Sequence, residues 1–219
     1  MITYNDIKHN EAISTYIRKA DESLVALGYT EHSFAHVGLV ASRAEYILST
    51  LGFSADDCEL VKIASHLHDI GNIVNRREHS QSGAVMAFRI LDKLEMDPSD
   101  IATIVSAIGN HDEGTGEAVN HIAAALIIAD KSDVRRTRVR NQDPTTFDIH
   151  DRVNYSAIET SLYINEEKTQ ITLDLTIDTT ISPVMDYFEI FLNRMLMCKK
   201  AAKTLNLEFK LVINDQAIM

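Results

Sequence analysis

Apolar residues recur at three- and four-residue spacing from about residue 5 to about residue 140, a pattern that is typical of amphipathic helices. Capping residues and glycines divide this region into successive segments. Ser54 is a good N-cap for one of them, Pro98 suits the first turn of another, and Gly71 marks a stop. We expect helices over about 5–28, from a cap at Thr30 to Leu51, and over 54–70, 80–95, 98–111 and 118–138.

The pattern changes after residue 140. The segment 141–144 has the composition of a loop, and the segments 160–164 and 170–177 form a predicted β-hairpin. A long helix should begin at Pro183 and end near Leu205, before a strand over 208–214. The sequence therefore predicts a mostly α protein with two parts: a helical domain over 1–140, and a small β-β-α-β extension over 141–219 that packs on it.

Charge and cysteine usage narrow the possible partners and compartments. The formal net charge of −11 argues against binding to duplex nucleic acid, which requires a basic face. The two cysteines, Cys58 and Cys198, are far apart in the sequence and have no CxxC spacing. With no secretory signal pattern and no apolar run of membrane-spanning length, we expect a cytoplasmic protein with reduced thiols and no membrane association.

Histidines and aspartates that suit a metal site are spread over several predicted helix ends. They occur in the order His36, His68-Asp69, His79, His111 and Asp130. Imidazole nitrogens and carboxylate oxygens bind catalytic divalent metals and can leave a position open for water. Adjacent residues on a helix point about 100° apart, so His68 and Asp69 can share a metal only near a helix end. The predicted stop at Gly71 places them there.

These residues carry a resemblance to the HD superfamily of metal-dependent phosphohydrolases. The matching positions are His36, the doublet in SHLHDIGN (65–72) and the aspartate in ALIIADKSD (125–133). The resemblance implies an HD-type helical bundle in which His36, His68, Asp69 and Asp130 bind a first metal.

His79 and His111 lie where the binuclear branch of the superfamily has further ligands, and there the doublet aspartate bridges two metals. The layout is similar to that of HD-GYP cyclic-dinucleotide phosphodiesterases. However, Asn72 replaces the lysine of their HDIGK motif, and residues 112–116 (DEGTG) replace the Gly-Tyr-Pro signature. Asp112 remains a possible oxygen ligand. The implied cofactors are two divalent metal ions. Iron or manganese is the expected metal, and magnesium, nickel or zinc would also fit such a site.

The implied activity is hydrolysis of a phosphate ester, on a nucleotide or another small phosphorylated molecule. A divalent metal activates water for this attack and offsets charge on the phosphoryl oxygens. Asp69 would act at the metals, while Lys131 and an arginine would hold the phosphate. Arg135 is our candidate from the basic cluster Arg135, Arg136, Arg138 and Arg140.

Two other functions fit the same residues. The ligand order also resembles that of di-iron HD-type oxygenases, which would act on a small polyol or phosphonate. A sensor that binds a nucleotide without turnover is the other alternative. The C-terminal extension carries no chemistry of its own that the sequence reveals. It could cover the substrate pocket, cap the bundle or form a homodimer contact.

Overall fold

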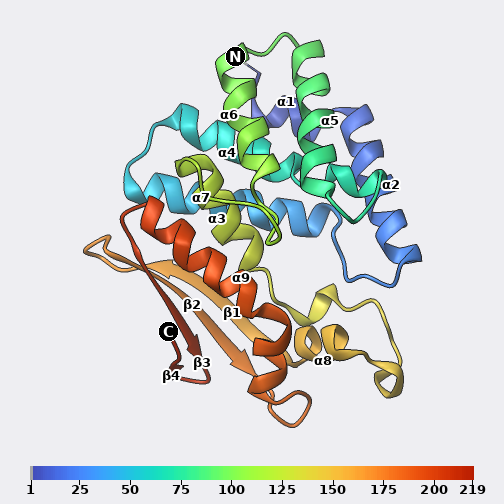
Figure 1. The fold of residues 1–219 in the computed structure, drawn as a ribbon, viewed down its shortest axis with the longest axis vertical. Helices are drawn as coiled ribbons and strands as arrows, with labels where there is room; N and C mark the ends of the chain where they lie inside the picture. Colours follow the sequence, from blue (N-terminus) through green and yellow to red (C-terminus); the bar gives the residue numbers. More distant parts are fainter. Residues whose placement is uncertain (1) are drawn as a thin grey trace.

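The centre of the bundle is α7 (His121–Lys131), in which every residue from Ile122 to Lys131 is buried. An apolar helix of this kind must be covered on all sides, and α3, α4, α6 and α9 surround it (Figure 1). The computed structural model describes residues 2–219. The other helices of the bundle are α1 (Tyr4–Lys8), α2 (Glu11–Ala26), α3 (Phe34–Leu51), α4 (Ala55–Leu67), η1 (Ile70–Ile73), α5 (His79–Lys93) and α6 (Pro98–Gly109).

Several predicted helix boundaries are confirmed, because the capping residues act as expected. The Ser54 side chain accepts a hydrogen bond from the backbone N–H of Asp57, and the Asp57 carboxylate accepts one from the backbone N–H of Ser54. These two bonds form a capping box at the start of α4. Pro98 is the first residue of α6, behind the N-cap Asp97. Gly52, with a φ of 87°, ends α3 in the left-handed conformation.

Three predicted boundaries are wrong. The helix expected over 5–28 is interrupted, because the Asn10 side chain accepts from the backbone N–H groups of Ala12 and Ile13 and starts a new helix. The N-cap of α3 is Ser33 rather than Thr30. The helix expected over 118–138 covers only residues 121–131, so Asp130 lies in its last turn and not near its middle.

The residue that caps the C-terminal end of α7 is held by a distant side chain. The guanidinium of Arg43 on α3 donates to the backbone carbonyl of Ser132 at 2.7 Å and to its hydroxyl at 2.9 Å. A carbonyl at a helix end needs such an outside partner. The chain then runs through the short 3-10 helices η2 (Arg136–Arg138) and η3 (Pro144–Thr146).

The C-terminal part forms a sheet that one long helix joins to the bundle. The predicted β-β-α-β order is confirmed, and α8 and β4 are additions that the sequence pattern did not reveal. The elements are α8 (Ile149–Ser156), β1 (Ala157–Ile164), β2 (Gln170–Ile177), α9 (Val184–Thr204), β3 (Glu208–Ile213) and β4 (Gln216–Ala217).

The strands of the described residues lie in the order β1-β2-β3-β4. The β2–β3 pair is parallel and the two outer pairs are antiparallel, so α9 is the crossover between parallel strands. It contacts β3 on one side and α7 on the other (Figure 1). A continuous apolar core therefore includes residues of both parts. Among the described residues, no helix has the length and apolar character that crossing a membrane would need.

Candidate metal centre

Side chains from three helices meet at a first cluster of ligand atoms. Nε2 of His36 lies 3.3 Å from Nε2 of His68 and 3.3 Å from Oδ1 of Asp130. Oδ2 of Asp69 lies 3.4 Å from Nε2 of His68 and 3.6 Å from Nε2 of His36. All four residues are buried. Two nitrogens and two carboxylate oxygens at these separations form a donor set that suits one divalent metal.

A second cluster begins at the other oxygen of the same aspartate. Oδ1 of Asp69 lies 3.3 Å from Nε2 of His79 and 3.9 Å from Nε2 of His111. The two histidine nitrogens are 3.1 Å apart. Asp69 thus presents one oxygen to each cluster, which is the arrangement of a bridging carboxylate. The structure brings together all six residues that the sequence singled out as metal ligands.

The four histidines point their Nε2 atoms toward the clusters because Nδ1 is held on the opposite side. In His36, Nδ1 lies 2.7 Å from Oδ2 of Asp133. In His68 and His111, Nδ1 donates to the backbone carbonyls of Ser65 and Ile108, at 2.7 and 2.6 Å. Nδ1 of His79 lies 3.1 Å from the carbonyl of Arg76. A proton on each Nδ1 leaves Nε2 free to bind a metal, so these partners fix ring orientation and tautomer.

The backbone at the doublet lets both of its side chains face one centre. Helix α4 ends at Leu67, and His68 keeps helical angles as the C-cap, whereas Asp69 has φ −95° and ψ 0° and begins η1. The predicted helix-end position of the doublet is confirmed. Gly71, however, lies inside η1 rather than stopping α4. A Cβ there would meet the backbone oxygen of His79 at 2.0 Å and the nitrogen of Gly83 at 2.4 Å, so only glycine lets α5 approach the doublet.

Asp69 has two further polar neighbours, Asn72 and Arg76, and only Arg76 was a candidate from the sequence, as a weaker phosphate contact. Nδ2 of Asn72 donates to Oδ1 of Asp69 and to its backbone carbonyl, both at 2.9 Å. Nη1 of Arg76 lies 4.0 Å from the same carboxylate oxygen. The sequence showed Asn72 only as a departure from a lysine motif; the structure shows that it orients the bridging carboxylate.

Burial and charge act in opposite directions on the ionisable ligands. Burial alone would raise the pKa of the Asp69 carboxyl, but the charge of His68 and hydrogen bonds to His68 and His79 hold it well below its usual range. Burial likewise opposes ionisation of Asp130, whose pKa the charge of Lys131 lowers. Burial would lower the pKa of His68, but Asp69 and Asp130 raise it to about 10. These surroundings keep both carboxylates ionised and attract a positive charge between them.

Lys131 is a partner of acidic side chains in this structure. Its Nζ lies 2.7 Å from Oδ2 of Asp130 and 3.2 Å from Oε1 of Glu113. The same Glu113 oxygen lies 2.9 Å from Nε of Arg194 on α9. A chain of alternating charges therefore connects the C-terminal extension to a candidate metal ligand. The proposed contact of Lys131 with phosphate stays a prediction.

The arginine cluster does not lie on a helix that continues from Asp130, so its members point in several directions. Arg135 donates through Nε to Asp133 at 2.9 Å and through Nη2 to Glu31 at 2.6 Å. It therefore holds in place the Asp133 carboxylate, which orients His36. Its predicted contact with phosphate stays a prediction.

Asp112, the other oxygen ligand considered from the sequence, lies beside His79. Its Oδ1 is 4.0 Å from Nδ1 of His79, the nitrogen that faces away from the clusters.

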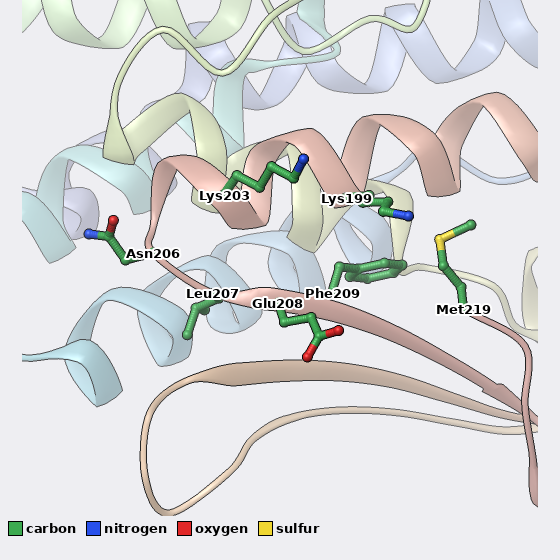
Figure 2. A pocket seen from close by; sticks show the side chains of 7 residues that line it. All are labelled: Lys199, Lys203, Asn206, Leu207, Glu208, Phe209 and Met219. Atoms are coloured by element: carbon green, nitrogen blue, oxygen red, sulfur yellow. The ribbon is translucent and has the colours of Figure 1, made fainter.

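A cavity of about 380 Å³ adjoins the clusters, between the bundle and the helices α8 and α9. Arg76 and His32 line it. Nη1 of Arg76 lies 3.4 Å from Nε2 of His79, and the ring of His32 lies 5.4 Å from that of His36. No candidate metal ligand lines the cavity itself, so Arg76 and His32 separate it from His79 and His36. A separate hollow of about 360 Å³ lies between α9 and β3, where Lys199 and Lys203 stand over Phe209 (Figure 2). Neither a candidate metal ligand nor Arg76 or His32 lines that second hollow.

Part of the chain matches a known domain family. The family model of the HD domain matches residues 31–136. The chain is similar to the uncharacterized protein MJ1020 of Methanocaldococcus jannaschii, with 27% identity over 160 aligned positions; the match covers 63% of this chain and 61% of that protein. The chain therefore spans under two thirds of this relative's length.

Among solved structures, the chain is similar to a predicted HD superfamily hydrolase from an uncultured Thermotogales bacterium. The identity is 25% and the TM-score 0.45, over 58% of this chain and 69% of that one. The matched residues 31–136 include all six of the candidate ligands. The candidate metal centre therefore lies entirely within the region of the chain that matches the HD domain.

Proposed function

We propose that the protein is a metal-dependent phosphohydrolase that cleaves a phosphate ester of a nucleotide or another small phosphorylated molecule. The observation that carries this proposal is the position of Asp69, whose two oxygens face two separate groups of histidines at 3.3–3.9 Å. His36, His68, Asp69 and Asp130 would hold one ion, and Asp69, His79 and His111 the other. Bound divalent ions activate water and offset charge on phosphoryl oxygens.

The residues around the clusters orient the candidate ligands and keep the carboxylates ionised. Asp133 holds His36 at 2.7 Å, so its Nε2 remains free. Lys131 lies against Asp130 and keeps that carboxylate ionised and oriented. Arg76 stands between Asp69 and the adjoining cavity, where its guanidinium can bind phosphoryl oxygens. The burial of the ligands limits the access of bulk water.

Three arginines in the lining of the cavity favour an anionic substrate. Arg76, Arg138 and Arg194 all reach it, although the whole chain carries a net charge of −11. A phosphate ester fits this lining better than a neutral polyol does. The same ligand set would also suit oxygen chemistry, so the test must separate the two reactions.

The test is phosphate and p-nitrophenol release by protein loaded with Mn²⁺ or Fe²⁺, with p-nitrophenyl phosphate and bis(p-nitrophenyl) phosphate as substrates. We expect turnover that chelation abolishes and that His68→Ala reduces at least about 100-fold. The exposed His9 supplies a control variant, His9→Ala, which should keep full activity. Oxygen uptake with a phosphonate or polyol and no ester cleavage would overturn the proposal, as would turnover that survives in His68→Ala.

A further inference from the structure

The cavity beside the metal ligands is built from both parts of the chain. Its walls include Arg76 from the bundle, Asn154 and Asp151 from α8, and Arg194 from α9. Its volume, about 380 Å³, lies within the range of about 300–1,000 Å³ that is typical of small-molecule sites. Residues outside the matched HD region therefore form a substantial part of the space next to the metal ligands.

Two guanidiniums in this cavity have donors left for a ligand. Arg194 uses Nε for its ion pair with Glu113, and its guanidinium stands 4.6 Å over the ring of Phe191. Arg76 makes its polar contacts through Nη1, to Asn72 and His79. The side chains are 23% and 24% exposed, respectively. Each held guanidinium thus keeps further N–H groups for the oxygens of an anion.

The α8 wall has a different chemistry. Asn154 is 4% exposed and lines the cavity. Its Nδ2 donates to the carbonyl of His150 at 2.9 Å, but its Oδ1 accepts no hydrogen bond from the described residues. Leaving such a buried polar atom unsatisfied is costly, so a native structure usually provides a partner. Asp148 and Asp151, which also line the cavity, offer further acceptors.

We propose that this cavity binds a phosphate ester whose organic part carries hydroxyl or amino groups. Arg76 and Arg194 hold the phosphate, while Asn154 and Asp151 accept hydrogen bonds from the organic part. The acidic residues of α8 repel the phosphate, so the ligand binds in one orientation, with its phosphate near the metal ligands. The C-terminal extension then determines substrate specificity. This inference rests on the proposed function for its substrate class.

The test measures binding without turnover. Chelator-treated protein is titrated calorimetrically with inorganic phosphate, ribose 5-phosphate and adenosine 5′-monophosphate. We expect the two esters to bind more tightly than phosphate. Arg194→Met should weaken all three at least about tenfold. Asn154→Leu should weaken only the two esters, by about three- to tenfold, because it removes an acceptor for hydroxyl or amino groups.

Two further variants keep the result interpretable if Asn154→Leu fails to fold. Asp151→Ala, at a partly exposed position, should weaken the esters without weakening phosphate. Lys203→Met, in the separate hollow of Figure 2, should leave all three affinities unchanged. Tighter binding of the nucleotide than of ribose 5-phosphate assigns the ligand to nucleotides, and equal binding assigns it to sugar phosphates.

The inference is overturned if neither ester binds. It is also overturned if the α8 variants affect phosphate and esters equally, or if Lys203→Met acts like Arg194→Met. Failure of the proposed function appears separately, as a metal-loaded wild-type protein that binds these esters but cleaves neither them nor the p-nitrophenyl substrates.

Discussion

Oδ1 of Asp69 lies 3.3 Å from Nε2 of His79, while the other oxygen of the same carboxylate faces the first cluster. Asp69 and His79 come from different elements, and the contact of Gly71 with α5 brings those elements together. Since Asp69 belongs to both clusters, its loss should have a larger effect than the loss of any histidine.

Asp69→Ala should therefore abolish binding at both clusters. We expect elemental analysis of the purified variant to find almost no bound metal, and hydrolysis to fall at least about 100-fold. A matched control is Asp92→Ala, because Asp92 is an exposed carboxylate on α5 with no role in either cluster. Retention of two metal equivalents in Asp69→Ala would contradict the bridging assignment.

His79→Ala should remove one metal equivalent and keep the other. His79 contributes only to the second cluster, whereas the first retains His36, His68, Asp69 and Asp130. The measurement is the metal-to-protein ratio after dialysis, for the variant beside wild-type protein and His9→Ala. If the wild-type protein itself holds a single equivalent that His79→Ala does not change, then His79 is not a metal ligand.

The residues of the candidate metal centre could be named from the sequence, because helix ends and the resemblance to a known family both point to them. A histidine–aspartate pair at the end of a capped helix has few ways to place both side chains on one metal, and Ser54 marks where that helix starts. The strand over 170–177 was equally clear from alternating apolar residues, and the structure has β2 at those residues.

What escaped prediction depends on contacts between residues far apart in the sequence. Arg43 binds Ser132, 89 positions away, at the end of α7, and the local sequence does not predict that contact. Arg194 on α9 forms an ion pair with Glu113, and no local sequence pattern predicts such a pair. Asn72 could not be assigned because its effect depends on the backbone turn at Asp69.

Metal binding should release about one proton from His68 at neutral pH. Asp69 and Asp130 raise the pKa of this histidine to about 10 in the metal-free protein, so it is protonated at pH 7 and must lose that proton to bind a metal. The apparent affinity should therefore rise with pH up to about 10. Calorimetric titration of Mn²⁺ in buffers of different ionisation enthalpy measures the number of protons released.

The same raised pKa affects the stability of the metal-free protein. A group whose folded pKa exceeds its unfolded value of 6.5 stabilises the fold fully below that value and progressively less toward pH 10. Urea unfolding of metal-free protein should show this loss between about pH 6.5 and 10, and His68→Ala should not. A pH-independent affinity for Mn²⁺ over this interval would contradict the assignment of the proton to His68.

Gly71→Ala should destabilise the protein by about 1–3 kcal/mol or more, because the added methyl group meets backbone that cannot move without displacing α5. The nearest atoms are the backbone oxygen of His79 at 2.0 Å and the backbone nitrogen of Gly83 at 2.4 Å. The displacement should also move His79 from Asp69 and weaken binding at the second cluster. The measurements are the free energy of unfolding in urea and the metal-to-protein ratio.

Gly38→Ala is the matched control for this substitution. Gly38 lies within α3, and a Cβ there would have no heavy atom within 4 Å. Alanine should therefore stabilise the helix by about 0.5–1 kcal/mol and leave metal binding unchanged. Equal effects of the two substitutions would show that glycine at position 71 contributes only backbone flexibility. Opposite signs, with loss of metal in Gly71→Ala alone, would show that close packing between η1 and α5 positions the second cluster.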